Sequence, residues 1–417
     1  MKYSFHKFSD KVSVANFINL CLNQGVNIVA ALIMTPYLFQ TLREENYGLV
    51  SLAFTLTLLF GMLVNYGFHF NIPQKLALLR DNTEEKEQII NELICTRLFL
   101  SFVMVVIIWL CSRYLGLFQG YSIILVFSTV QLLNDALYPM FILQGFDRLS
   151  WLSKANAVSK LLYVLLVVMF IDSPEDAKWV NFILGGSGFV VHGGLLVFIY
   201  RAESIKPRWV EFKRIKYWLT NNFQFFFSTV AGHITVNGGT IILKSFVDNT
   251  ELGYYALTQR VAILLRTVPV FITQAIIQNA TRLYADDRSK FDSYLKNSQR
   301  NGLIITFMVC FLLAITSKWV VRILAGEYIP LSSNLLIILS ALPFLGMFNV
   351  SNMIRVLVAE EKYILSKANW ITAVFMVIIC SIGSYYHGSY GLAFALVIVE
   401  IFNFLILHYY LVKRGLK

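Results

Sequence analysis

The sequence predicts an all-α membrane protein with about twelve transmembrane helices, arranged as two six-helix lobes around a central cavity. Hydrophobic residues make up 57% of the 417 residues and charged residues only 14%. The mean hydropathy is +0.64, a value typical of integral membrane proteins. Uncharged runs such as 12–42, 46–74 and 217–243 exceed the ~20 residues that a spanning helix needs.

Hydropathy and charge together place the individual spans. The long uncharged run 368–399 is split by a turn at 383–389, where glycine and serine interrupt the apolar sequence. Continuous apolar runs, without strict alternation, favour helices over a β-barrel. The sequence predicts spans at 13–38, 47–70, 93–112, 118–143, 155–171, 179–200, 218–246, 253–281, 301–323, 333–358, 364–384 and 390–412.

Lysine and arginine are distributed unevenly between the two sets of loops. The amino-terminal side carries 23 of them and the opposite side at most five, which predicts that both termini are cytoplasmic. This topology explains the net charge of +11 without a nucleic-acid partner. The five cysteines all lie in predicted spans, so we expect no disulfide framework and no metal site.

A basic segment at 201–217 divides the chain into two predicted lobes, 1–200 and 218–417. Each lobe holds six spans and starts in the cytoplasm, as expected for parallel repeats that bind their substrate at the lobe interface. The stretch 46–52 after the first span aligns with 251–257 after the seventh, which supports a repeat. We expect the basic segment to be a cytoplasmic linker that faces anionic lipid.

Polar side chains form stripes on three of the predicted helices. Such stripes face protein or water, because polar groups in hydrocarbon are costly. Interhelical hydrogen bonding is one explanation of the stripes. Because the stripes recur on matched helices, a hydrated central cavity is the favoured explanation. The stripes contain Asn16, Asn19, Asn23 and Asn27; Asn222, Thr229, His233, Asn237, Thr240 and Lys244; and Arg260, Thr267, Gln274 and Gln278.

Basic residues outnumber acidic ones inside the spans. Arg260 and Arg266 lie roughly 10 and 20 Å into the eighth span, too deep to reach the interface easily, and we expect them to form a cationic substrate site with Lys244 and His233. The remaining basic residues lie near cytoplasmic helix ends, where snorkelling is the expected role. They are Arg97, Lys160, Arg355 and Lys367.

Two carboxylates, Asp135 and Glu400, lie within the spans. They are candidates for coupling transport to H⁺ or Na⁺, and charge compensation of a nearby arginine is the alternative. The sequence contains no nucleophile elbow, Walker loop, HExxH or CxxC motif. We therefore expect a transporter that needs no cofactor, and no enzyme.

Several short motifs, in this order along the chain, resemble the polysaccharide repeat-unit flippases, the O-antigen (Wzx-type) branch of the superfamily that also contains multidrug and toxin extrusion carriers. That family usually has Leu-Gly where Leu42-Arg43 stands here, and a proline near the end of the eighth span, where Gln278-Asn279 stands. The motifs are Thr35-Pro36-Tyr37-Leu38, Tyr47-Gly48-Leu49, Asn65-Tyr66-Gly67-Phe68, Phe141-Ile142-Leu143-Gln144-Gly145, Leu252-Gly253-Tyr254-Tyr255-Ala256 and Gly326-Glu327-Tyr328.

The resemblance implies a bacterial inner-membrane translocase. Its substrate would be an undecaprenyl-pyrophosphate-linked oligosaccharide for lipopolysaccharide biosynthesis, and its partner proteins a polysaccharide polymerase and a chain-length regulator. Arginine suits the pyrophosphate, because its planar fork matches phosphate oxygens. The alternatives are an ion-coupled exporter of drugs or small molecules with the same fold, an exporter of capsular, teichuronic or peptidoglycan precursors, and a scaffold or scramblase.

Overall fold

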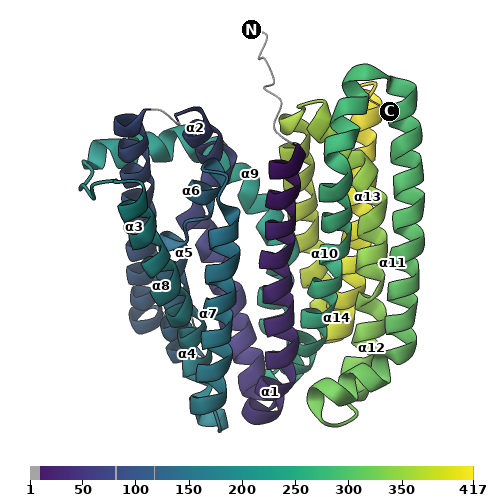
Figure 1. The fold of residues 1–417 in the computed structure, drawn as a ribbon. Helices are drawn as coiled ribbons and strands as arrows, with labels where there is room; N and C mark the ends of the chain where they lie inside the picture. Colours follow the sequence, from purple (N-terminus) through teal and green to yellow (C-terminus); the bar gives the residue numbers. More distant parts are fainter. Residues whose placement is uncertain (1–9, 80–81, 117, 417) are drawn as a thin grey trace. The chain divides into compact units, whose positions relative to one another are not determined.

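The structure, a computed structural model, describes residues 10–79, 82–116 and 118–416, without the side chains of 10–18, 20, 21, 70, 278 and 362. Every regular element in this part of the chain is a helix (Figure 1). Ten of the helical stretches are long and apolar enough to cross a membrane. The predicted all-α membrane fold is confirmed.

Two of these stretches contain two spans each. Helix α1 (Asp10–Asn65) is interrupted at Arg43, where φ is 63° and ψ is 169°. Helix α14 (Lys362–Lys413) is interrupted at His387 and Gly388, where φ is 54° at the glycine. The breaks fall where the sequence predicted turns, so the ten stretches hold the twelve predicted spans.

The helices form two compact units that are interleaved along the chain. Unit 1 comprises the chain up to Met34 and Leu56–Phe227, and unit 2 comprises Thr35–Thr55 and Ser228–Lys417. Helices α1 and α9 (Phe212–Lys244) each contribute to both units. The predicted division at the basic segment 201–217 stays a prediction.

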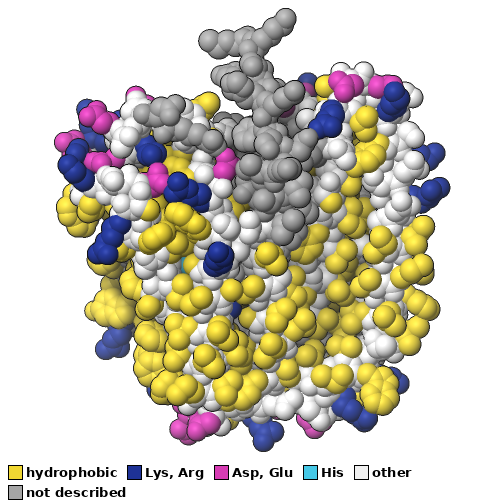
Figure 2. All heavy atoms as spheres, viewed as in Figure 1, with side chains coloured by type: hydrophobic (Ala, Val, Ile, Leu, Met, Phe, Trp, Pro, Cys, Tyr) yellow, Lys and Arg dark blue, Asp and Glu magenta, His cyan; other side chains and the backbone are white. Residues whose placement is uncertain are grey.

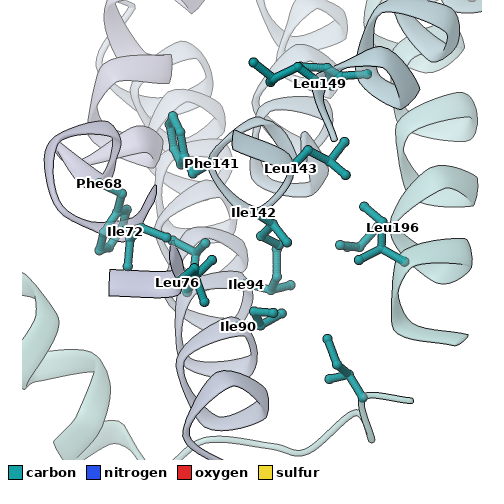
Figure 3. Close-up of a cluster of buried hydrophobic side chains, with 14 of the residues drawn as sticks. Phe68, Ile72, Leu76, Ile90, Ile94, Phe141, Ile142, Leu143, Leu149 and Leu196 are labelled. Atoms are coloured by element: carbon teal, nitrogen blue, oxygen red, sulfur yellow. The ribbon is translucent and has the colours of Figure 1, made fainter. Parts of the chain in front are cut away.

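Unit 1 contains, besides its parts of α1 and α9, the helices that follow α1 up to residue 202. Figure 3 shows part of its core, where Phe68 lies beside Ile72, and Leu76 lies near Ile90 and Ile142. These helices are η1 (Phe68–Phe70), α2 (Ile72–Leu78), α3 (Thr83–Tyr114), α4 (Ser122–Ser128), α5 (Val130–Leu137), α6 (Met140–Gly145), α7 (Leu149–Phe170), η2 (Pro174–Asp176) and α8 (Ala177–Ala202).

The predicted span 118–143 is divided into α4, α5 and α6. Proline has no backbone N–H, so Pro139 cannot donate to the carbonyl of Asp135 in the preceding turn. Helix α5 therefore ends at Leu137, and Tyr138 takes an extended conformation. The break leaves carbonyl oxygens of a membrane-embedded helix in need of other donors.

The basic segment after α8 is fixed to α3 in unit 1. The Asn91 side chain donates to the Lys206 carbonyl at 2.9 Å and accepts from the Arg208 N–H at 3.2 Å. The buried Glu92 carboxylate accepts from Arg214 Nε at 2.7 Å and from Trp218 Nε1 at 2.6 Å. Acidic residues of α3 thus neutralise part of the charge that the sequence assigned to a lipid-facing linker, and they anchor the start of α9.

Unit 2 packs the 35–55 part of α1 and the rest of α9 with five further helices. In α11 the small or polar residues Gly302, Thr306 and Cys310 are buried, whereas Phe307 and Phe311 are exposed. This inside-out pattern is expected of a helix that packs through small residues and faces lipid with large ones. The further helices are α10 (Asn249–Asp286), α11 (Arg288–Ala325), α12 (Pro330–Leu339), α13 (Ala341–Val358) and α14.

The surface agrees with this pattern in both units. Figure 2 shows hydrophobic side chains along the middle of the helices, with lysine, arginine and acidic side chains gathered toward the helix ends. Such a distribution matches a lipid-facing band between two polar interfaces.

Candidate functional site

The asparagine stripe of α1 faces α7 in unit 1. Asn156 of α7 donates from Nδ2 to the Asn23 carbonyl at 3.2 Å and to Asn27 Oδ1 at 3.3 Å. Ser153 of the same helix donates to the Asn19 carbonyl at 2.8 Å. The Asn16 side chain lies outside the described side chains. Interhelical hydrogen bonding, the alternative left open by the sequence, accounts for these contacts.

Arg97 of α3 is buried in unit 1 and does not snorkel. Arg97 is only 1% exposed, so its predicted position at the membrane interface is wrong. Helix α3 begins ten residues before the predicted span, at Thr83, which places Arg97 about 20 Å from the helix start. A guanidinium at that depth must be satisfied by protein groups.

Three oxygen atoms around the break in α5 accept hydrogen bonds from the terminal nitrogens of Arg97, and its buried Nε has no partner among the described residues. Nη1 donates to the Tyr138 carbonyl at 2.9 Å, and Nη2 donates to Asn65 Oδ1 at 2.9 Å and to the Asp135 carbonyl. The Asp135 carbonyl is the one that Pro139 leaves without a backbone donor. Arg97 therefore caps α5, and its charge lies at the negative end of the helix dipole.

The Asp135 carboxylate lies next to this cap. Gln131 donates from Nε2 to Asp135 Oδ1 at 3.3 Å. A Cβ atom on Gly61 would lie 2.5 Å from Asp135 Oδ2, so the carboxylate packs directly against the second half of α1. Arg97 and Lys160 both interact with Asp135 electrostatically. Charge compensation, the second interpretation of this carboxylate, is therefore what the contacts in unit 1 support.

The other polar groups of unit 1 are also joined to one another. Nδ1 of His192 in α8 lies 2.7 Å from Asn134 Oδ1, and Asn23 donates to the Tyr138 hydroxyl at 3.3 Å. Asn222 of α9 is fully buried in unit 1, where its Oδ1 accepts from Asn71 at 2.5 Å. Asn222 is thus part of the packing between α9 and the α2 region.

The α9 residues of unit 2 differ in their surroundings. Lys244 donates to Asn249 Oδ1, which ties it to the start of α10. His233 is partly buried, and its Nδ1 has no hydrogen-bond partner among the described residues. Asn237 is also partly buried, and Thr240 donates to Gln259 Oε1 at 2.6 Å.

The two arginines of α10 have different partners. Arg266 Nη2 lies 2.7 Å from Glu400 Oε2 of α14, and both side chains are largely buried. Arg260 Cζ lies 5.6 Å from the centre of the Phe54 ring, and Arg260 forms no hydrogen bond or ion pair with the residues that the structure describes. Arg266 is neutralised within unit 2, whereas the Arg260 guanidinium remains available to an anion.

The remaining predicted residues of α10 contribute less. Thr267 donates to the Leu264 carbonyl within its own helix at 2.6 Å. Gln274 is exposed, and the side chain of Gln278 lies outside the described ones. The sequence interpretation missed Arg97, Asn65 and Asn156 as members of a polar core; the signal that could have found Arg97 is Pro139, four residues after Asp135.

One protein family and two curated proteins resemble this chain in sequence. The family model described as "Polysaccharide biosynthesis protein" matches residues 13–277. A protein of Escherichia coli (strain K12), named "Putative O-antigen transporter", is 24% identical over 330 residues, which are 79% of this chain and 80% of that protein. A protein of Shigella dysenteriae with the same name is 21% identical over 391 residues, 93% of this chain and 96% of that protein.

Solved structures of two-lobe transporters have the same fold. The lipid II flippase MurJ in an inward closed conformation has a TM-score of 0.71 at 15% identity, over 97% of this chain and 87% of that one. An inward-facing multidrug resistance MATE family transporter of the MOP superfamily has a TM-score of 0.68 at 13% identity, over 92% and 97%. Since the family model matches more than half of its residues, the chain belongs to the polysaccharide biosynthesis protein family.

Proposed function

We propose that this chain moves undecaprenyl-pyrophosphate-linked O-antigen or related repeat units across the bacterial inner membrane by alternating access. The family and the names of the relatives support the polysaccharide class of substrate. The likeness to flippase and transporter structures supports a transporter fold, and no enzymatic step is needed.

The observation that carries the anionic part of the proposal is the state of Arg260. Among the deep arginines of the described residues, Arg266 pairs with Glu400, and Arg97 donates three hydrogen bonds to oxygen atoms around α5. Arg260 alone of these three has no oxygen partner among the described residues, and its guanidinium lies 5.6 Å from the centre of the Phe54 ring. An unpaired guanidinium inside a membrane protein is costly unless an anion binds it for part of the cycle, and a pyrophosphate suits its geometry.

The test uses a strain without the gene, complemented with wild-type or Arg260→Gln protein. We expect Arg260→Gln to abolish surface polysaccharide and to cause lipid-linked repeat units to build up on the cytoplasmic leaflet, while the protein stays in the membrane at its normal level. Arg322→Gln is the matched control, because Arg322 is an exposed arginine of the same unit. Normal polymer from Arg260→Gln would remove this residue from the mechanism.

The deletion strain also separates the alternatives. Drug sensitivity without accumulation of lipid-linked repeat units would favour the small-molecule exporter. Loss of capsule or of cell-wall polymer with normal O-antigen would favour the related precursor exporters.

A further inference from the structure

The break in α5 creates a group of oxygen atoms that has the composition of a cation site. The Asp135 and Tyr138 carbonyls and Asn65 Oδ1 surround the two terminal nitrogens of the Arg97 guanidinium. Carbonyl oxygens at the end of an interrupted membrane helix, with a carboxylate nearby, are ligands that suit Na⁺ in transporters. In this protein the Arg97 guanidinium, a cation that is part of the chain, occupies this position.

Arg97 is also held too firmly to exchange with an ion from solution. It is 1% exposed, and its Cζ lies 5.1 Å from the centre of the Phe141 ring. Its two terminal nitrogens donate three hydrogen bonds. Asp135 itself is partly exposed. An ion that reached the carboxylate would therefore meet a fixed positive charge beside it.

The other described neighbours of Asp135 do not complete a second cation site. Gln131 of α5 directs an N–H donor at Oδ1, Gly61 of α1 lies against Oδ2, and Lys160 of α7 adds another positive charge. His192 of α8 interacts with the same lysine and bonds to Asn134. The Lys160 charge and the Gln131 N–H oppose a metal cation at this carboxylate. The one further oxygen atom that Gln131 offers is its buried Oε1, which accepts no hydrogen bond from the described residues.

We infer that Arg97 is a built-in counter-cation that takes the position of an exchangeable Na⁺ at Asp135, so that unit 1 binds no Na⁺ there. The sequence left H⁺ and Na⁺ open as coupling ions for this carboxylate. The inference goes beyond the proposed transport function, and it concerns ion binding by the resting protein. It can therefore fail or succeed independently of what the protein transports.

The test measures the Tm of the purified full chain in detergent as NaCl replaces choline chloride at constant ionic strength. We expect no Na⁺-specific shift for the wild type. Arg97→Gln empties the oxygen cage and leaves the Asp135 charge, so this variant should gain a saturable Na⁺-dependent rise in Tm of about 2–4 °C. The rise should disappear in the double variant Arg97→Gln/Asp135→Asn, which has the cage without the charge.

Two results would overturn the inference. One is a wild-type protein that Na⁺ stabilises and whose response Asp135→Asn removes. The other is a folded Arg97→Gln protein that shows no response to Na⁺.

If Arg97→Gln does not fold in ordinary buffer, its folded yield is measured with and without Na⁺ beside the double variant. Recovery of the single variant by Na⁺, with a double variant that folds in either buffer, supports the inference. Equal loss of both variants whatever the cation contradicts it.

Discussion

Gly48 and Gly253 pack against each other within unit 2. A Cβ atom on Gly48 would lie 2.7 Å from the Gly253 nitrogen, and one on Gly253 would overlap the Glu44 carbonyl. The two glycines occupy matching positions in the segments that the sequence aligned as repeats, 46–52 and 251–257. Equivalent turns of the two halves thus contact each other through backbone atoms, which only glycine permits at this distance.

Gly253→Ala should destabilise the protein. The added methyl group meets backbone atoms of Glu44, which cannot rotate away, and overpacking of this kind costs about 1–3 kcal/mol. Thermal unfolding of the purified protein measures the effect. Gly232→Ala is the control, because nothing lies within 4 Å of its Cβ position; equal Tm values for the two variants would contradict the close contact.

Arg43→Gly should stabilise the protein. Arg43 has a φ of 63° and a ψ of 169°, a conformation that costs a residue with a Cβ atom about 1–3 kcal/mol and costs glycine little. The flippase family usually has glycine at the corresponding position. We expect a higher Tm for Arg43→Gly and no gain for Arg43→Ala, which keeps the Cβ atom. A gain of the same size from alanine would assign the effect to the lost charge.

Arg266→Gln should destabilise the protein far more than replacement of both Arg266 and Glu400. It leaves the Glu400 carboxylate largely buried without its partner at 2.7 Å, and breaking a buried pair in this way typically costs about 3–5 kcal/mol. The double variant Arg266→Gln/Glu400→Gln should recover most of that stability. Thermal unfolding and the yield after detergent extraction measure the stability of both variants. A double variant as unstable as the single one would show that Arg266 and Glu400 do not stabilise the protein as a pair.

Asp287 should make the start of α11 sensitive to acid. The Lys290 and Ser289 backbone N–H groups donate to its carboxylate at 3.1 and 2.9 Å. These hydrogen bonds hold the pKa of Asp287 below its usual 3.8. A carboxylate with a lowered folded-state pKa stabilises the fold above its unfolded pKa, and this contribution is lost as pH falls through the folded value.

The measurement for this prediction is Tm as a function of pH across that range. Asp287→Asn keeps a capping oxygen without the titrating charge, so its Tm should fall less than that of the wild type on acidification. Asp286→Asn is the control, because it removes the charge of the adjacent acidic residue and leaves the Asp287 cap in place. Identical acid sensitivity in the wild type and Asp287→Asn would exclude this cap as a source of the pH dependence.

Much of the fold could be predicted because hydropathy and loop charge are local properties of a membrane protein. A run of apolar residues must form its own backbone hydrogen bonds in lipid, so it becomes a helix whatever its neighbours are. The turns near Arg43 and at Gly388 follow from the same reasoning, since one helix cannot hold twice the membrane thickness of apolar sequence. The number of spans therefore came from the sequence.

The site was predicted less well, because a helical stripe shows which residues share a face and not what that face meets. Asn23 and Asn27 share a face as predicted, yet that face meets Asn156 of α7. Arg97 was placed at the interface by its distance from the first apolar residue. Helix α3 begins well before that residue, so the distance was measured from the wrong point.

An α-helical membrane protein of twelve spans, its charge asymmetry and its resemblance to polysaccharide flippases all follow from the order of the amino acids. Which intramembrane charges cancel becomes visible in the folded chain. Arg266 meets Glu400 across helices more than a hundred residues apart in the chain. Arg97 meets the Asp135 carbonyl freed by Pro139 and the Tyr138 carbonyl beside it, and Arg260 meets a ring. Charge neutralisation depends on distances between helices, and sequence separation does not encode those distances.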